Sequence, residues 1–169
     1  MIEKYDRPII GKEKILDIGP GNNPHREASH FMDIMVINME NWIKHDANIV
    51  PYPFESEQFT KIYMRHTLEH LEQSDDLIFR ELYRLLVVGG KAFISVPNSL
   101  FIYHRLLYLT GNIPPDFVLT HRKHYSFKQL KMNLRNNGFK VFEFNNKWVF
   151  NPLRNYFHPH IKIVAKKIG

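Results

Sequence analysis

Residues 15–23 constrain the fold of this 169-residue chain more than any other segment. A short apolar run, residues 14–18, is rich in β-branched side chains and is followed directly by glycines, which predicts a buried strand ending in a tight loop. Gly19 and Gly21 can adopt backbone angles that other residues resist, and they let a ligand approach bare main chain. Asp17 comes at the end of the strand, where open α/β sheets bind ligands. The segment therefore predicts a nucleoside-type cofactor site.

The glycine loop does not match the dinucleotide-binding fingerprint, because Pro24 occupies the place of the third glycine. Only residues 25–29 separate this proline from the next apolar run. That length leaves barely one helical turn, and so a weak dipole for a pyrophosphate at a helix N-terminus. We therefore disfavour a hydride-transfer enzyme, and equally a plain structural turn that binds no ligand.

The following sequence alternates strand-like with helix-like segments. Ser74 can cap a helix whose apolar residues recur at helical spacing, and Gly89 and Gly90 are expected to end it. The alternation predicts an α/β fold with a mostly parallel sheet covered on both faces. Apolar runs predict its strands at residues 14–18, 30–36, 42–47, 61–65 and 91–96.

The second half of the chain predicts a lid and a closing pair of strands. An extra helix and a proline-interrupted loop are expected to form a lid-like insertion over about residues 99–125. Ser126 can begin a further helix that Gly138 ends. We see no linker, so we expect a single domain over residues 1–169. Two apolar runs near the C-terminus predict antiparallel strands, at residues 139–144 and 161–165.

Composition excludes several classes of protein. The chain has no cysteine, which excludes disulfides, thiolate catalysis and cysteine-zinc sites. No apolar run approaches the roughly 20 residues of a membrane helix, and the N-terminus lacks a secretory signal, so we expect a cytoplasmic protein that does not enter the membrane. The net charge of +6 is spread through the C-terminal half, where we interpret it as a solvated face.

Six short motifs follow one another along the chain: residues 15–21 (ILDIGPG), 31–34 (FMDI), 45–47 (HDA), 51–54 (PYPF), 66–70 (HTLEH) and 82–98. In this order they resemble the class I S-adenosylmethionine-dependent methyltransferases, and most closely the small single-domain members with a short first helix. The resemblance covers about residues 14–166, although Pro20 replaces a common cysteine and Val88 a usual proline. It implies a doubly wound, mostly parallel Rossmann-like methyltransferase sheet with an antiparallel C-terminal strand.

The same resemblance implies S-adenosyl-L-methionine as the cofactor. Asp17 is expected to attract the positive methionyl end, Asp33 to accept from the ribose hydroxyls, and Asp46 to accept from the adenine amino group. Each aspartate alone is more simply a turn or cap residue, but three at successive strand ends favour one shared site. The full set implied to bind the cofactor is Asp17, Gly19, Pro20, Gly21, Asp33, Ile34, Asp46, Ala47 and His66.

Methyl transfer from a sulfonium mainly requires that donor and acceptor are held at near-attack distance. The expected catalytic residues are His66 and His124, because a histidine can take a proton from an attacking hydroxyl or amine. His124 lies in a segment that resembles the acceptor side of small family members. Alternatively, His121 or His124 only hydrogen-bonds a neighbouring loop. We expect the acceptor to be an oxygen or nitrogen of a small or sugar-like metabolite.

Two other functions stay open. The basic C-terminal half allows an RNA-modifying methyltransferase, which would bind nucleic acid with a strong salt dependence. The replaced proline and short first helix also allow a non-catalytic module that binds S-adenosylmethionine without turnover. The sequence leaves the oligomeric state undetermined.

Residues 66–70 also raise the question of a metal ion. Their H-x-x-E-H pattern matches some zinc peptidases, but that reading requires a helix, and here the motif follows a predicted strand. Some metal-dependent O-methyltransferases, including ubiquinone-pathway and small-RNA 3′-end enzymes, resemble this loop but carry glutamate at the position of His66. That resemblance implies a divalent-ion set of Glu69, His70 and either His121 or His124. Since the glutamate-histidine pair can equally order the loop, a metal is not our favoured interpretation.

Overall fold

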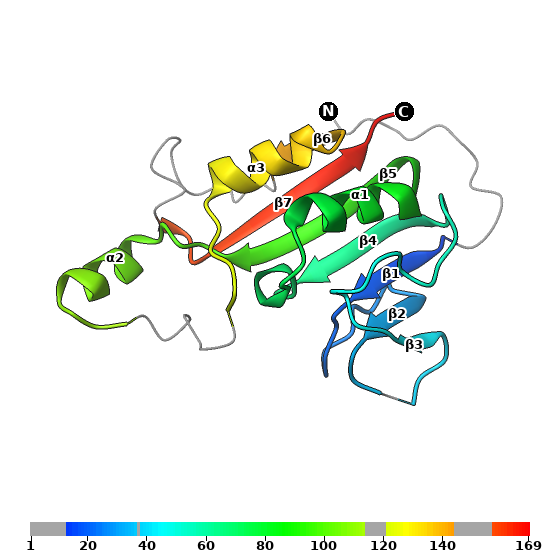
Figure 1. Cartoon of the computed structure of the whole chain (residues 1–169), viewed down its shortest axis with the longest axis horizontal. Helices are drawn as coiled ribbons and strands as arrows, with labels where there is room; N and C mark the ends of the chain where they lie inside the picture. The colour runs from blue at the N-terminus through cyan, green and yellow to red at the C-terminus, as the bar shows by residue number, and fades with distance from the viewer. Residues whose placement is uncertain (1–12, 37, 114–120, 144–156) are drawn as a thin grey trace.

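The computed structural model describes residues 13–36, 38–113, 121–143 and 157–169 (Figure 1). The strands form one sheet in the order β3-β2-β1-β4-β5-β7-β6. The neighbouring pairs β3–β2, β2–β1, β1–β4 and β4–β5 are parallel, whereas β7 runs antiparallel to both β5 and β6. This confirms the predicted α/β, mostly parallel Rossmann-like sheet with an antiparallel C-terminal strand. The elements are β1 (Ile15–Ile18), β2 (His30–Asp33), β3 (Trp42–Lys44), β4 (Phe59–Arg65), the 3-10 turn η1 (Leu68–His70), α1 (Asp75–Leu85), β5 (Leu86–Pro97), α2 (Ile102–Leu109), α3 (Phe127–Asn136), β6 (Phe139–Glu143) and β7 (His160–Lys167).

The helix starts follow the predicted capping residues. The hydroxyl of Ser74 accepts a hydrogen bond from the Leu77 amide at the start of α1, and that of Ser126 accepts from the Gln129 amide at the start of α3. These bonds satisfy amides that have no partner within the helix. Gly138 follows α3 with φ of +86°, as a helix-ending glycine does.

The predicted end of α1 is wrong. The helix ends at Leu85, and Gly89 and Gly90 lie inside β5, where the register between β4 and β5 shifts. Gly89 has φ of +84°, and a Cβ on Gly90 would lie 2.9 Å from the Val87 carbonyl oxygen. The two glycines therefore form an irregularity that lets β5 begin early, and they do not terminate a helix.

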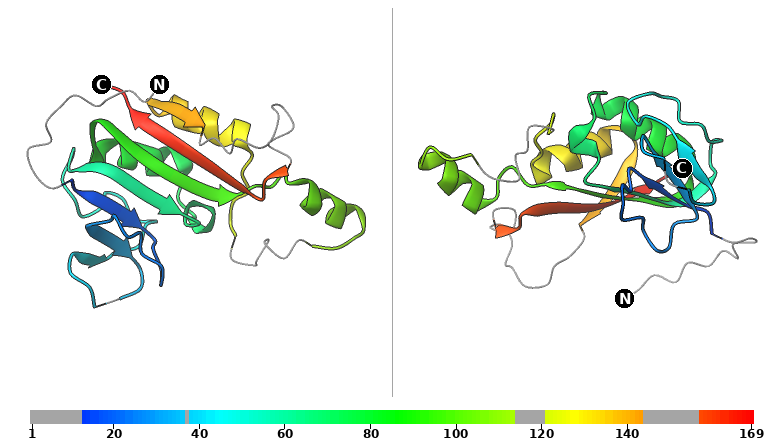
Figure 2. Two further views of the ribbon diagram at one scale, coloured as in Figure 1. Left: turned by 180° about the vertical axis from the view of Figure 1, so that it is seen from behind. Right: turned by 90° about the horizontal axis from the view of Figure 1, so that it is seen from below.

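Helices α1 and α3 lie on the same face of the sheet (Figure 2). Alternate side chains of the strands point to these helices and are buried with Phe79 and Leu82 of α1 and Leu130 and Leu134 of α3. The opposite face carries no helix among the described residues, although we expected cover on both faces. Residues 19–29, which join β1 to β2, form only turns and bends, because they are too few for a crossover helix. Core side chains from the strands are Leu16, Ile18, Ile62, Met64, Ala92, Ile94, Val96, Ile161, Ile163 and Ala165.

Helix α2 projects beyond the end of the sheet, within the predicted lid (Figure 1). Residues 114–120 of that insertion lie outside the described residues, so the lid-like insertion and the single domain remain predictions. No described helix is long and apolar enough to cross a membrane.

Candidate functional site

The loop after β1 reaches the carboxyl edge of the sheet with two glycines in left-handed conformations. Gly19 has φ of +67°, and a Cβ there would lie 2.4 Å from the Thr67 hydroxyl oxygen, so only glycine fits. Gly21 has φ of +52°, but nothing lies within 4 Å of the position its Cβ would take. Pro20, between them, is buried and its carbonyl accepts from the Asn23 amide. The backbone at Gly21 is thus open to a ligand.

Asp17 is fully buried under this loop and is held by two donors. Its Oδ2 accepts from the His25 amide at 2.7 Å and from the Arg65 guanidinium at 2.9 Å. Its Oδ1 is buried and has no hydrogen-bond partner among the described residues. Burial raises the pKa of Asp17, although the His25 amide and Arg65 act in the opposite direction. A cationic ligand beside Oδ1 would favour the carboxylate form.

Two residues that the sequence interpretation missed hold the loop in place. Arg65, the last residue of β4, donates to the Asn23 carbonyl at 2.7 Å as well as to Asp17. Thr67 lies close to the carbonyls of Ile18 and Gly19, with Oγ1 at 3.2 and 3.3 Å. Arg65 ends β4 and Thr67 follows it, and β4 is adjacent to β1. This position beside the glycine loop was the sequence signal that could have identified them.

Asp33, at the end of β2, joins the same loop. One carboxylate oxygen accepts from the Gly21 amide and the other from the Met35 amide, each at 2.9 Å. Asp33 is 8 % exposed, whereas the side chain next to it, Ile34, is 63 % exposed. Since the Gly21 amide bonds to Asp33, the ends of β1 and β2 form one continuous site with an apolar surface at Ile34.

Asp46 lies in the next loop, after β3. Its Oδ1 accepts from the backbone and side-chain amides of Asn48, at 2.8 and 3.0 Å. The His45 amide donates to the Asp33 carbonyl at 2.9 Å, and the Tyr52 hydroxyl donates to the Ala47 carbonyl at 3.0 Å. Hydrogen bonds thus connect the loops after β1, β2 and β3. The three predicted aspartates lie near the carboxyl ends of these neighbouring strands: Asp17 within β1, Asp33 at the end of β2 and Asp46 after β3.

The loop after β4 brings His66 and Glu69 together. His66 has φ of +52°, and its amide donates to the Ser95 carbonyl at 2.9 Å. The Nδ1 atom of His66 lies 3.3 Å from Glu69 Oε1, an ion-pair distance that lacks hydrogen-bond geometry. The Glu69 side chain is 1 % exposed, and neither oxygen has a hydrogen bond among the described residues. A buried carboxylate without a hydrogen bond is costly, so this one is suited to a ligand.

Two histidines, His70 and His121, lie beside the Glu69 carboxylate. One ligand atom each from Glu69, His70 and His121 lie within 4.8 Å of one another, and the two histidine rings are 4.7 Å apart. Burial lowers the pKa of His121, and the neighbouring His70 lowers it further. The ring is therefore neutral near pH 7, the form in which imidazole binds a metal. His124 is exposed and lies outside this set among the described residues.

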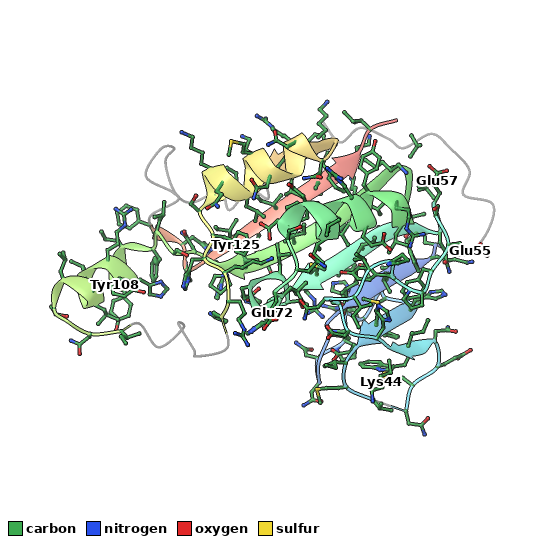
Figure 3. The ribbon with its side chains drawn as sticks, in the orientation of Figure 1. Lys44, Glu55, Glu57, Glu72, Tyr108 and Tyr125 are labelled. Carbon is green, nitrogen blue, oxygen red and sulfur yellow. The ribbon has the colours of Figure 1, made fainter. Side chains whose placement is uncertain are left out.

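The segment that carries His121 is anchored to η1 and α1. The amides of Arg122 and Lys123 donate to the Glu69 carbonyl at 2.8 and 3.1 Å. Tyr125, labelled in Figure 3 just before α3, is buried and donates to Asp75 of α1 at 2.8 Å. Residues about 50 positions apart in sequence are thus fixed against each other, which holds His121 beside Glu69.

A separate open hollow of about 620 Å³ lies at the other edge of the sheet, where β1 and β2 begin. Lys14, His30 and Tyr52 are among its lining residues. None of the predicted site residues lines it, so we do not associate it with the chemistry of the carboxyl edge.

Comparisons with known proteins found one matching family and several similar solved structures. The sequence profile of the methyltransferase domain matches residues 4–143. A SAM-dependent methyltransferase from Archaeoglobus fulgidus has a similar structure, with a TM-score of 0.65, 20 % identity, and coverage of 93 % of this chain and 87 % of that one. No curated protein sequence matches the chain significantly.

Two further solved structures share the fold. One, from Thermotoga maritima, is described as a possible histamine N-methyltransferase, and it matches with a TM-score of 0.64, 15 % identity, and coverage of 94 % and 84 % of the two chains. A SAM-dependent methyltransferase from Methanosarcina mazei matches with a TM-score of 0.62, 18 % identity, and coverage of 96 % and 98 %. At these identities the likeness concerns the fold alone.

Proposed function

The chain belongs to the methyltransferase-domain family and is a class I S-adenosylmethionine-dependent methyltransferase, and from that premise we propose that its acceptor is an oxygen or nitrogen of a small or sugar-like metabolite. One observation carries the proposal: the glycine loop and the histidine-glutamate cluster lie on the same edge and are connected through consecutive residues 65–70. The Thermotoga maritima protein of similar fold, by its description, points to a small nitrogen acceptor.

The residues of the first three loops fit the cofactor. Gly21 leaves open space over its backbone, and Asp17 has a buried oxygen without a partner, as expected beside a cationic ligand. When bound, S-adenosylmethionine supplies the electrophilic methyl group. We assign Asp33 to the ribose hydroxyls and Asp46 to the adenine amino group, with the exposed Ile34 packing on the base.

His66 is the residue we assign to deprotonation of the acceptor. Its Nδ1 lies 3.3 Å from Glu69 Oε1, so we assign proton transfer to the other ring nitrogen, Nε2. The side chain is 45 % exposed, so an acceptor can reach it. His124 is also exposed but lies outside the cluster, and we assign it a secondary role on the acceptor side.

A divalent metal beside His66 also becomes the favoured interpretation once the geometry is considered. The two Glu69 oxygens without hydrogen bonds, with His70 and His121 within reach, fit a metal better than they fit a loop-ordering role. When bound, such an ion would act as a Lewis acid that lowers the pKa of an acceptor hydroxyl. Glu69, His70 and His121 would hold it, and His66 would remain next to the acceptor.

The test is transfer of a tritiated methyl group from S-adenosylmethionine to a panel of catechols, sugars and primary amines, with and without EDTA. We expect a labelled small product, at least a tenfold loss of rate in H66A, and a smaller loss in H124A. Label that enters only RNA would favour the RNA-modifying alternative. Cofactor binding without any product would favour a non-catalytic module. A cytoplasmic location remains a prediction.

A further inference from the structure

Helix α2 carries an apolar stripe that is exposed to solvent. Ile102, Leu106 and Leu109 are spaced by four and three residues, so they lie close to one direction around the helix. Leu106 is 54 % and Leu109 83 % exposed, and Ile102 and Ile113, which follows the helix, are exposed as well. We call these four residues the α2 stripe. Single exposed apolar side chains are ordinary, but a contiguous group of this kind marks a contact surface.

The stripe points away from the body of the protein. His104 is the buried residue of α2, and its ring packs edge-on against that of Phe101, with 5.1 Å between the ring centres. Because successive residues of a helix are about 100° apart, His104 lies roughly 190° around the helix from the centre of the stripe. Figure 1 shows α2 projecting beyond the end of the sheet. The helix therefore packs through its His104 side and presents the stripe to its surroundings.

The part of the chain that carries α2 is strongly cationic. Residues 86–169 contain 13 lysines and arginines but two acidic residues, whereas residues 1–85 contain 10 and 15, so the two parts have net charges of +11 and −5. The cationic part contributes β5, β7 and β6, which are neighbours at one side of the sheet, and both α2 and α3. Such an asymmetry of charge is typical of proteins that contact an anionic surface or polymer.

Basic side chains lie close to the α2 stripe. Arg105 is exposed and lies about 70° around the helix from the centre of the stripe. Lys128 is exposed in the first turn of α3. The Ser99 amide donates to the Tyr125 carbonyl at 3.0 Å, so the segments that lead into α2 and α3 are fixed against each other. An apolar stripe and flanking cations thus belong to one end of the molecule.

We propose that α2 docks on a membrane surface that contains anionic lipids, with the stripe among the acyl chains and Arg105 and Lys128 at the headgroups. Helices that lie in the membrane interface combine an apolar face with basic residues. A second copy of the chain would bring two parts of net charge +11 together, and nucleic acid offers no aliphatic surface for leucines. Charge complementarity and the stripe together therefore favour lipid.

This surface binding differs from our expectation, from the sequence, of a protein that stays off the membrane. That expectation considered segments that cross a bilayer, and the eight residues of α2 are too few to do so. A helix that lies on the surface needs only a short apolar face. The proposal concerns binding alone and does not depend on the methyl acceptor.

The test is sedimentation of the full chain with vesicles of equal parts phosphatidylcholine and phosphatidylserine, in a salt series. We expect binding that weakens as salt rises, and roughly tenfold or more weaker binding to vesicles of phosphatidylcholine alone. L106S/L109S should bind the anionic vesicles roughly tenfold or more weakly, because two apolar side chains no longer enter the acyl region. R105Q should bind them about fivefold more weakly, because one headgroup contact is lost.

Matched variants separate α2 from the rest of the surface. I49S/V88S replaces two exposed apolar side chains elsewhere and should leave vesicle binding unchanged. K44Q removes an exposed charge from β3, and Figure 3 shows Lys44 far from Tyr108 of α2, so its binding should also be unchanged. Circular dichroism spectra that match the wild type would show that each variant is folded.

Three results would overturn the proposal. The first is absence of binding to the anionic vesicles at low salt, whether or not the protein binds an oligonucleotide. The second is an equal loss of binding in folded L106S/L109S and I49S/V88S. The third is a wild-type dimer that does not bind vesicles and that L106S/L109S converts to a monomer, because a second copy would then cover the stripe.

Discussion

The carboxyl edge of the sheet has two halves that are completed in different ways. The donor half consists of the loops after β1, β2 and β3. In it, Asp17, Asp33 and Asp46 each accept a hydrogen bond from a backbone amide. The acceptor half consists of η1 and residues 121–125. There the Glu69 carboxylate is buried and neither of its oxygens has a hydrogen bond among the described residues, whereas in Asp17 only Oδ1 lacks one. The donor half is therefore shaped largely by its own main chain, whereas in the acceptor half His66 lies at ion-pair distance from Glu69 and we propose that a metal ion adds to it.

The largest effect should come from Gly19, in the donor half. In G19A the added Cβ meets the Thr67 hydroxyl, and the residue must keep a positive φ. We expect a loss of roughly 2–5 kcal/mol in unfolding free energy, from about 1–2 for the left-handed backbone and about 1–3 for overpacking. Urea denaturation measures this loss.

The control for this variant is Gly21, where the space is open. G21A should lose only the backbone part, about 1–2 kcal/mol, while it also weakens cofactor binding because its methyl group occupies the ligand's space. T67A in the G19A background should restore part of the stability. Equal losses in G19A and G21A would show that the loop does not pack on Thr67 as described.

The next effect concerns Glu69, in the acceptor half. In the metal-free protein, E69Q replaces one buried polar group without a hydrogen bond by another and removes the ion pair with His66, so we expect little change in unfolding free energy. With manganese at 100 times its Kd, the wild type should gain about 2.7 kcal/mol, and E69Q should gain little. Thermal unfolding with EDTA or manganese provides both readings. A wild type indifferent to divalent ions would remove the metal from the proposal.

A smaller effect should separate His121 from His124. The pKa of His121 is lowered from 6.5 by burial and by His70. As the pH falls, His121 in the unfolded chain therefore binds a proton at a higher pH than His121 in the folded protein. The contribution of His121 to stability is present above about pH 6.5 and is lost as the pH falls through the lowered pKa. H121Q should abolish manganese-dependent stabilisation and H124Q should retain it; the reverse order would assign the ligand to His124.

The sequence predicted that the glycine loop and Asp33 lie at one edge of the sheet because their determinants are local. A strand, a glycine loop and an acidic residue follow one another within residues 15–21, and the same pattern of strand and acid recurs at Asp33. The order of these elements implied a parallel sheet, which brings the strand ends to one edge. Local patterns did not reveal Arg65 and Thr67, whose contacts reach back nearly 50 residues to the loop.

The acceptor half and the sheet faces were harder to predict. Whether His121 or His124 approaches Glu69 depends on anchors such as Tyr125 to Asp75, which are 50 residues apart in sequence. The face without a described helix could not be anticipated from periodicity, since strand alternation predicts two faces but not what covers each of them.

The most direct test of the account is calorimetric titration of S-adenosylhomocysteine into the wild type and into D33A. Asp33 connects the Gly21 amide to the proposed ribose site, so its removal should disrupt the donor half while the core remains folded. We predict a wild-type Kd below millimolar and at least a thirtyfold weaker value in D33A, with matching circular dichroism spectra. An unchanged Kd in a folded D33A, or no binding by the wild type, would contradict a cofactor site built on these three loops.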